Sequence, residues 1–211
     1  MSSERLVQDR SRCYNRFMKT EYEAKFLDVD VEDARDMLRQ VGAKLEKPMR
    51  LMRRVTIENE DLVAKNAFVR VRDEGDRATM TYKQFDVLSV DGAKEHEIVV
   101  SSFDDAVALL GAAGLPHQSF QESKRETWSW NDVEIVIDEW PWLKPYIEIE
   151  SSSGERVKYF AEKLGYVWDD AVFGDVMAAY RAEYPHLSPT DTLGRIAEVR
   201  FEDPLPDLLL N

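Results

Sequence analysis

The feature that most constrains this chain is an alternation of charged and apolar residues that recurs along most of its length. In TEYEAKF, residues 20–26, Glu21, Glu23 and Lys25 alternate with apolar residues. Successive side chains of a β-strand point to opposite faces of the sheet. The segment therefore predicts a strand with one charged face and one apolar face.

Later segments show a similar pattern and follow one another closely. The predicted strands lie at about residues 20–29, 48–58, 67–73, 77–85, 94–101, 118–130, 133–139 and 145–151. The links at 73–77 and 131–132 are of hairpin length, which is too short for the crossovers that parallel strands need. About eight antiparallel strands is the number at which a sheet closes into a barrel with a narrow interior.

Segments with apolar residues at helical spacing separate groups of these strands. The predicted helices lie in the segments at about residues 30–45, 102–115, 154–166 and 171–184. In the first segment, Gly42 is expected to stop the helix. Such helices need an apolar surface to pack on, and the apolar faces of the strands supply it. We therefore expect an α+β fold, a closed eight-stranded antiparallel β-barrel, or tunnel, with helices packed on the outside.

The length of the chain suits one domain with short flanking segments. We expect a tunnel domain over residues 19–185, a polar N-terminal extension over 1–18 and a C-terminal tail over 186–211. A content of 44% hydrophobic residues can fill a sizeable core and argues against disorder. The five tryptophans are expected to pack in that core or on the barrel exterior.

The charged strand faces either meet solvent or line a cavity, and alternation alone favours solvent, which is the commoner case. The charges, however, are mostly arginine and glutamate, and their signs are grouped by strand. Acidic pairs stand on the first and last predicted strands and basic residues in the middle, at Glu21, Glu23, Glu148, Glu150, Arg70, Arg72 and Lys83. If the sheet closes, the four glutamates meet and would repel one another without a divalent cation between them. A basic wall facing such a cation suits a phosphate chain.

The net charge limits the classes of partner. With 28 basic and 41 acidic residues, the formal charge is −13, which repels nucleic acid and anionic membranes at long range. No run approaches the roughly 18 apolar residues of a membrane span. We therefore expect no nucleic-acid partner and no membrane partner, and the sequence leaves a homodimer open.

Cysteine and histidine usage bears on the compartment and on the metal. The single cysteine, Cys13, excludes an internal disulfide and fits a reducing cytoplasm, where we expect this protein to reside. Three scattered histidines do not make a zinc site. Any metal would be held by carboxylates, which indicates a hard cation such as Mg²⁺ or Mn²⁺.

A series of charged motifs runs through the predicted strands in a fixed order. The spacing Glu21-x-Glu23-x-Lys25 is followed by MRRVTIEN (52–59), VRVR (69–72), TYKQ (81–84), KEHEIVV (94–100), SKRETW (123–128) and VIDEWPWLKPYIEIE (136–150). The first motif resembles the ExExK signature of the CYTH superfamily, the triphosphate tunnel metalloenzymes, and the others resemble that superfamily's later motifs. The resemblance spans roughly residues 20–183 and implies a tunnel that binds triphosphates together with Mg²⁺ or Mn²⁺.

Carried over position by position, the resemblance implies a role for most of the charged residues. The implied metal ligands are Glu21, Glu23, Glu148 and Glu150. The implied catalytic residues are Glu21, Glu23, Lys25 and Asp138. The implied contacts to the triphosphate oxygens are Lys25, Arg53, Arg70, Arg72, Lys83 and Arg125. Glu95 and Glu97 match an acidic pair that would orient the arginines or help to hold a second metal.

Two basic positions have alternatives. Within MRRVTIEN, counting back from Glu58 favours Arg53 as the phosphate contact, and we assign Arg53. The alternation of apolar residues after the motif favours Arg54 instead. The resemblance also implies a further basic group near the C-terminus, for which Arg181 and Arg195 are the candidates.

The resemblance implies a metal-dependent hydrolase of inorganic tripolyphosphate, thiamine triphosphate or a nucleoside triphosphate. The first alternative is a class IV-like adenylyl cyclase, in which the ribose 3′ oxygen replaces water as the nucleophile. Cyclases of that class often carry a histidine–phenylalanine pair just upstream of ExExK. Here Phe17 has no histidine beside it, which favours hydrolysis. The second alternative is a non-catalytic protein that binds phosphate polymers or nucleotides.

Overall fold

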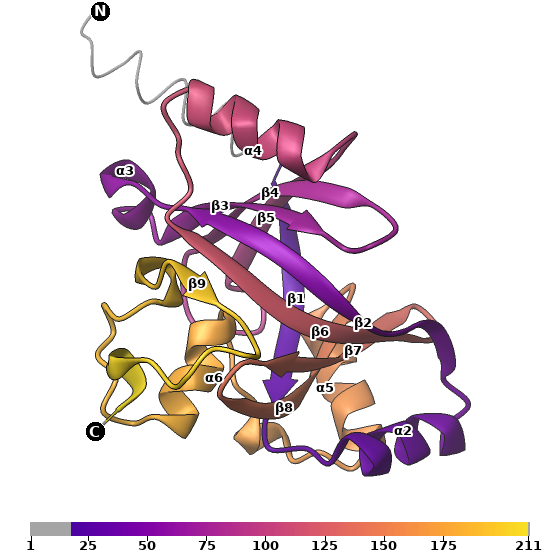
Figure 1. Cartoon of the computed structure of the whole chain (residues 1–211). Helices are drawn as coiled ribbons and strands as arrows, with labels where there is room; N and C mark the ends of the chain where they lie inside the picture. The colour runs from indigo at the N-terminus through magenta and orange to yellow at the C-terminus, as the bar shows by residue number, and fades with distance from the viewer. Residues whose placement is uncertain (1–17, 211) are drawn as a thin grey trace, which may run out of the picture.

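The computed structural model describes residues 18–210, so most of the predicted extension over 1–18, Cys13 included, lies outside the described residues. Within 18–210, nine strands form one sheet, and eight of them close into a barrel (Figure 1). The predicted α+β fold with a closed antiparallel barrel is confirmed.

The strands coincide closely with the alternating segments of the sequence. They are β1 (Lys19–Phe26), β2 (Lys44–Ile57), β3 (Ala67–Asp73), β4 (Ala78–Phe85), β5 (Ala93–Val100), β6 (Ser119–Trp130), β7 (Val133–Trp140), β8 (Leu143–Ser151) and β9 (Glu198–Val199). The order around the barrel is β2-β3-β4-β5-β1-β8-β7-β6, with antiparallel neighbours, and β6 pairs with β2 to close it. The short β9 adds to β6 in parallel, outside the ring.

The first strand of the barrel lies beside the last one. In the β1–β8 ladder, Glu23 stands opposite Glu150 and Lys25 opposite Glu148. The other edge of β1 pairs with β5. Barrel closure therefore brings the two acidic segments of the sequence together, although more than a hundred residues separate them along the chain.

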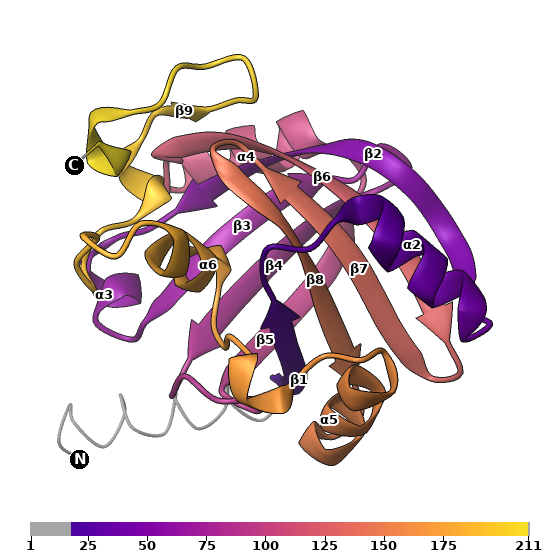
Figure 2. The same cartoon turned by 90° about the horizontal axis from the view of Figure 1, so that it is seen from below.

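Helices cover the outside of the barrel (Figure 2). They are α2 (Val31–Gln40), α3 (Glu60–Val63), α4 (Phe103–Ala112), α5 (Gly154–Lys163) and α6 (Val176–Glu183). The apolar faces of α2 and α5 pack on the outward side chains of β1, β7 and β8 and form the main hydrophobic core. Leu110 of α4 packs on the outer face of β2 and β3. Since the apolar faces of the strands are covered by the helices, the charged faces point into the barrel.

The helix predicted in the segment 30–45 runs from Val31 to Gln40. Gly42 follows with φ of 79°, in the left-handed region that ends helices, and Lys44 already begins β2. The prediction that this glycine ends the helix is therefore confirmed.

The C-terminal part packs on one end of the barrel. The helix predicted over 171–184 begins only at Val176, because Val172 forms a β-bridge with Lys25. In the segment predicted as a tail, Leu187, Leu193, Val199 and Leu209 share a hydrophobic cluster with side chains of β7, β8 and α6. Short 3₁₀ helices at Leu193–Arg195 and Asp207–Leu209 lie within it.

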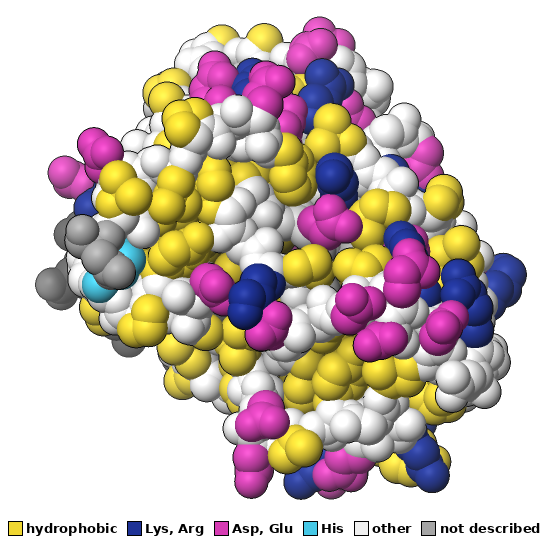
Figure 3. Space-filling view, turned by 60° about the horizontal axis from the view of Figure 1, so that its bottom comes forward, with side chains coloured by type: hydrophobic (Ala, Val, Ile, Leu, Met, Phe, Trp, Pro, Cys, Tyr) yellow, Lys and Arg dark blue, Asp and Glu magenta, His cyan; other side chains and the backbone are white. Residues whose placement is uncertain are grey.

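The charges on the surface are mixed. On the face shown in Figure 3, acidic and basic side chains lie side by side among hydrophobic ones. No helix within residues 18–210 is long and apolar enough to cross a membrane. Separation of the charges by sign is instead a property of the barrel interior.

Candidate functional site

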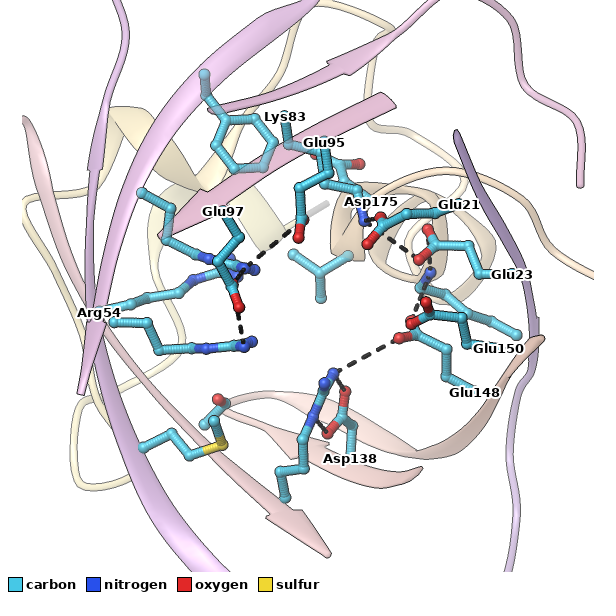
Figure 4. Close-up of a pocket in the computed structure, with 18 of the residues that line it drawn as sticks. Glu21, Glu23, Arg54, Lys83, Glu95, Glu97, Asp138, Glu148, Glu150 and Asp175 are labelled. Carbon is cyan, nitrogen blue, oxygen red and sulfur yellow. Dashed lines mark hydrogen bonds and ion pairs between the residues drawn. The ribbon is translucent and has the colours of Figure 1, made fainter. Parts of the chain in front are cut away.

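A cavity of about 510 Å³ lies inside the barrel and is lined by inward side chains of all eight barrel strands. Figure 4 shows the labelled acidic residues of β1 and β8 on one side and Arg54 on the other. The strand alternation explains this lining, because every second residue of each strand faces inward. The predicted cavity is therefore present, and the charged faces do not simply meet solvent.

The acidic side of the cavity holds two lysine ammonium groups. Lys25 Nζ lies 2.7 Å from Glu148 Oε2 and 3.3 Å from Glu23 Oε1. Lys83 Nζ lies 2.7 Å from Glu21 Oε2 and 3.2 Å from Glu23 Oε2. Lys83 therefore lies among the carboxylates, and not in the basic wall where the sequence placed it with Arg70 and Arg72.

The pKa values of these groups reflect that crowding. Burial acts to lower the pKa of Lys25, but Glu148 and Glu23 outweigh it, so the pKa is raised. Burial acts to raise the pKa of Glu148, but Lys25 and then Arg125 outweigh it, so the pKa is lowered. Both Lys25 and Glu148 are therefore charged, and both are largely shielded from solvent. Loss of either one would leave the other charge unpaired and would lower the stability of the fold.

Two other glutamates carry unfavourable charge. Burial, followed by the negative charge of Glu21, raises the pKa of Glu150 to about 7. The same two causes raise the pKa of Glu95 to about 7. The negative charge of the carboxylates on this side is thus larger than the positive charge of the two lysines. Glu21 is the carboxylate whose charge acts on both Glu150 and Glu95.

The basic side consists of Arg54, Arg70 and Arg72, on neighbouring strands β2 and β3. The pKa of Arg54 is lowered to about 9, first by burial and then by the positive charges of Arg70 and Arg72. Burial and then Arg70 likewise lower the pKa of Arg72 to about 10. Arg54 Nε donates to Gln121 Oε1 at 2.8 Å, and no ion pair to a carboxylate is found for it within 18–210. These guanidinium groups repel one another, so an anion bound between them relieves the repulsion.

Carboxylates behind the arginines hold them in place. Asp138 accepts two hydrogen bonds from Arg125, at 2.7 and 2.6 Å. Glu74, in the β3–β4 turn, accepts two from Arg72, at 3.1 and 2.7 Å. The effect is to fix the orientation of each guanidinium while leaving other N–H groups free to meet a ligand.

Arg70 is held more loosely. Its Nη2 donates to Thr81 Oγ1 at 3.2 Å and lies 3.6 Å from Glu97 Oε2 and 3.9 Å from Glu95 Oε2. Both of these glutamates line the cavity. Their position beside Arg70 agrees with the expectation that they orient arginines.

Two of the predicted residues lie elsewhere. The Arg53 side chain is 51% exposed and pairs with Asp73 on the outer face, so its assignment as a phosphate contact was wrong. The neighbouring Arg54 takes the inward position, as the apolar alternation favours, because the residues on either side of Thr56 pack outward under α4. Arg181 is also outside the cavity lining, and it donates to backbone carbonyls of the C-terminal segment.

Several cavity residues were missed from the sequence. Trp140, expected as packing, lines the cavity and lies under the Arg54 guanidinium, 4.2 Å from its carbon to the ring centroid. Glu74, which holds Arg72 without lining the cavity itself, was taken only as part of a turn. Asp175 comes from the C-terminal part, and the single available signal was its position as the N-cap of α6. Trp140 has the same parity as Asp138 in β7, so strand alternation could have indicated it. Alternation gives no such signal for Glu74 and Asp175, because they lie outside the strands.

The donor set on the acidic side fits a hard divalent cation. Five carboxylates share this side with two ammonium groups; they are Glu21, Glu23, Glu95, Glu148 and Glu150. Carboxylate oxygens are the ligands that Mg²⁺ and Mn²⁺ take. Within residues 18–210, however, no three acidic, histidine or cysteine side chains already form a metal-binding group. Metal binding would therefore require the lysines to shift away from the carboxylates.

Several solved structures share this fold. A conserved hypothetical protein from Pyrococcus furiosus is 20% identical, with a TM-score of 0.62 over 72% of this chain and 94% of its own. A protein from Vibrio parahaemolyticus, described as a candidate adenylate cyclase, is 12% identical, with a TM-score of 0.66 over 75% and 96%. A Hippeastrum protein, described as a candidate adenylyl cyclase with a dominant triphosphatase activity, is 16% identical, with a TM-score of 0.54 over 77% and 96%. These identities establish similarity of fold alone.

Comparison with protein sequences adds the family. No curated protein sequence matches the chain significantly. The family model described as "CYTH domain" matches residues 19–167, which is well over half of the chain and contains all eight barrel strands. The resemblance of the charged motifs is thereby confirmed, and the chain belongs to the CYTH domain family.

Proposed function

We propose that this protein is a divalent-metal-dependent hydrolase of small triphosphate substrates, which bind inside the barrel. Tripolyphosphate, thiamine triphosphate and nucleoside triphosphates are the substrates to be tested. The observation that carries the proposal is the charge arrangement of the cavity, with buried arginines on one side and a surplus of carboxylates on the other.

The arginine side supplies the binding of the phosphate chain. After burial, the positive charge of Arg70 contributes to the lowered pKa of both Arg54 and Arg72, so an anion bound between these guanidinium groups is stabilised. Arg125, fixed by Asp138, extends this surface toward Glu148. Guanidinium groups bind phosphate oxygens through paired, charge-assisted hydrogen bonds.

The carboxylate side supplies the metal site. Glu21, Glu23, Glu148 and Glu150 would hold Mg²⁺ or Mn²⁺, with Asp138 nearby but engaged with Arg125. When bound, the cation would neutralise phosphate charge and supply an activated water. The excess negative charge around Glu21 supports this assignment, since a cation relieves it.

The residues of the chain contribute mainly position and charge. Phosphoryl transfer requires stabilisation of charge on the phosphate oxygens, and preorganised donors provide it without reorganisation during the reaction. Arg72 and Arg125 are preorganised in this sense by Glu74 and Asp138. Lys25 and Lys83 line the cavity together with the carboxylates that they contact, and their ammonium groups would be available to phosphate oxygens.

The comparisons support an enzyme that acts on triphosphates. They are compatible with two reactions, hydrolysis and cyclisation. The Hippeastrum protein is described with both an adenylyl cyclase name and a triphosphatase activity. Water and a ribose hydroxyl are both able to attack a metal-bound triphosphate. Upstream of ExExK, the chain lacks the histidine that class IV cyclases often carry, which favours water as the nucleophile.

The test is turnover by the purified full chain with Mg²⁺ or Mn²⁺ and each of three substrates: tripolyphosphate, thiamine triphosphate and ATP. We expect release of inorganic phosphate that stops when EDTA removes the metal. Pyrophosphate and cyclic AMP from ATP would instead identify a cyclase. Tight binding of all three substrates without any turnover would identify a binding protein. The absence of both binding and turnover would refute the proposal.

A further inference from the structure

We propose that Trp140 and Thr56 are substrate-binding residues, which donate uncharged hydrogen bonds to oxygens of the bound phosphate chain. This inference rests on the function proposed above, because it assumes that a triphosphate binds beside the buried arginines. It adds to the charged side chains of the cavity two donors that carry no charge. Neither residue belongs to the charged pattern from which the site was predicted.

The indole N–H of Trp140 is a buried donor without a partner. Trp140 lines the cavity and is 5% exposed. Its Nε1 is shielded from bulk solvent, and no hydrogen-bond partner for it is found among residues 18–210. Buried donors in folded proteins are nearly always paired, because an unpaired donor loses its hydration without compensation. A ligand in the cavity would supply the missing acceptor.

Trp140 lies on the arginine side of the cavity. The guanidinium carbon of Arg54 is 4.2 Å from the centroid of the Trp140 ring, so an anion bound to Arg54 lies close to the indole as well. The pKa of Arg54 is lowered by burial and then by the charge of Arg70, which shows that these guanidinium groups repel each other. An uncharged donor at this place would strengthen the binding of an anion without adding to that repulsion.

The hairpin that follows Trp140 is held in a conformation that few residues adopt. Trp142 has a φ of 62°, in the left-handed region that is costly for a bulky side chain. The Tyr180 hydroxyl donates to the Pro141 carbonyl, and the Tyr184 hydroxyl donates to the Trp142 carbonyl. Strain of this kind persists only where surrounding contacts impose it, and it is frequent at ligand sites. The fixed hairpin therefore favours a binding role for the side chain that it positions.

Thr56 provides a second donor of the same kind. It is 6% exposed and lines the cavity, and its Oγ1 is buried without a hydrogen-bond partner in the described part of the chain. Thr56 follows Arg54 by two residues on the inward face of β2 and stands opposite Arg70 in the β2–β3 ladder. Thr56 is thus a direct neighbour of two arginines of the basic side.

Thr79 offers a matched comparison for Thr56. Its Oγ1 is also buried and lacks a hydrogen-bond partner within residues 18–210, and the residue is 0% exposed. Thr79 does not line the cavity, however. A loss of ligand binding on substitution of Thr56 but not of Thr79 would therefore result from the position in the cavity, and not from removal of a buried hydroxyl.

Binding of tripolyphosphate with Mg²⁺ to the purified full chain tests both donors. Trp140→Phe keeps an aromatic ring beside Arg54 and removes the N–H. Thr56→Val keeps the shape of the side chain and removes the hydroxyl. Each should raise Kd at least about tenfold, the effect of losing one hydrogen bond to a charged group, and Thr79→Val should raise it less than about twofold.

Trp128→Phe is the control for the loss of an indole N–H. Trp128 Nε1 donates to Glu126 Oε1 at 2.7 Å, in the hydrophobic core outside the barrel. Trp128→Phe should lower the midpoint of urea unfolding without ligand and should change Kd less than about twofold. Trp140→Phe has no such hydrogen bond to lose, so it should lower this midpoint less while it weakens binding.

NMR observes each indole N–H directly. The chain has five tryptophans, and the Trp140 indole signal is the one that is missing in Trp140→Phe. Addition of tripolyphosphate and Mg²⁺ to the unchanged protein should move this signal downfield, as a new hydrogen bond does, and should leave the Trp128 signal in place. If Trp140→Phe does not fold, the Trp140 signal is assigned by elimination, from variants of the other four tryptophans.

The outcomes separate this inference from the proposed function. If the unchanged protein binds tripolyphosphate, an unchanged Kd in Trp140→Phe or an unmoved Trp140 indole signal overturns the inference, although the proposed function stands. An unchanged Kd in Thr56→Val overturns the assignment of Thr56 in the same way. Absence of binding by the unchanged protein refutes the proposed function, and this inference with it.

Discussion

The guanidinium carbon of Arg54 lies 4.2 Å from the centroid of the Trp140 ring, inside the tunnel. The ring supports the arginine from one side, and Gln121 accepts a hydrogen bond from its Nε. Cation–π contact of this kind stabilises a positive charge without supplying a counter-anion. Arg54 is therefore held in position while its charge stays available for a ligand.

Arg54 and Arg53 form a matched pair for mutation. Arg54→Ala should raise KM for tripolyphosphate about 10- to 100-fold, since a charge-assisted hydrogen bond contributes about 1.5–3 kcal/mol. Arg53→Ala, which removes a surface ion pair with Asp73, should change KM less than about twofold. Steady-state phosphate release measures both. A larger effect at Arg53 would contradict the cavity geometry.

Glu148 has a double role, as the partner of Lys25 and as a proposed metal ligand. Glu148→Gln should lower metal-dependent turnover by about 10²–10³-fold, the range seen when one electrostatic contact at a reaction centre is lost. It should also cost about 3 kcal/mol of folding stability, because the buried Lys25 ammonium would lose its nearer carboxylate partner and keep only the one of Glu23. Phosphate release and urea unfolding measure the two effects. Glu139→Gln, in a pair with Lys124 on the outer face, is the control and should leave both unchanged.

If Glu148→Gln failed to fold, Glu150→Gln would carry the test of metal binding. Among residues 18–210, the ion pair of Glu150 is with Lys19, whose side chain is 75% exposed, and not with a buried lysine. A folded Glu150→Gln protein with full metal-dependent turnover would show that the carboxylate is not a ligand.

The Arg125–Asp138 pair should be strongly coupled. A double-mutant cycle with Arg125→Ala and Asp138→Ala should give an interaction energy of about 2–3 kcal/mol in urea unfolding, because the pair is buried and has two hydrogen bonds. The Arg39–Asp36 pair on α2 has a similar distance, 2.7 Å, but both side chains are more than half exposed. Its cycle should give less than about 0.5 kcal/mol. Equal coupling in the two pairs would mean that the barrel interior is well hydrated.

The raised pKa of Glu95, about 7, predicts how stability depends on pH without metal. Since the folded protein binds this proton more tightly than the unfolded chain, the contribution to stability is complete below about pH 4.5. It is lost as the pH rises through about 7. Glu95→Gln should therefore match the unchanged protein near pH 5 and exceed its free energy of unfolding by about 1–3 kcal/mol at pH 8.

Urea unfolding in EDTA at the two pH values measures this effect. Glu202→Gln, at an exposed position of the C-terminal segment, is the control. A variant less stable than the unchanged protein at pH 8 would contradict the crowding of carboxylates around Glu21.

Much of the barrel could be predicted from the sequence because strand alternation is a local property. The residues that face inward, such as Glu21, Arg70 and Glu148, follow from a period of two within each strand. The hairpin-length links between strands indicate antiparallel neighbours. Arg53 was assigned as the phosphate contact by counting back from Glu58, against the alternation, which favoured Arg54. Arg54 is the residue that lines the cavity, so the alternation was the better guide.

The sequence by itself thus determined the strands, their faces and the chemical character of the tunnel wall. Only the tertiary structure decided which inward side chains meet. Register and closure place Lys83 among carboxylates, although it lies beside arginines in the order of the strands. The same holds for Asp175 and Leu193, which reach the cavity from outside the barrel strands. Such contacts depend on hydrogen bonding and packing between segments far apart in the chain, which no local pattern encodes.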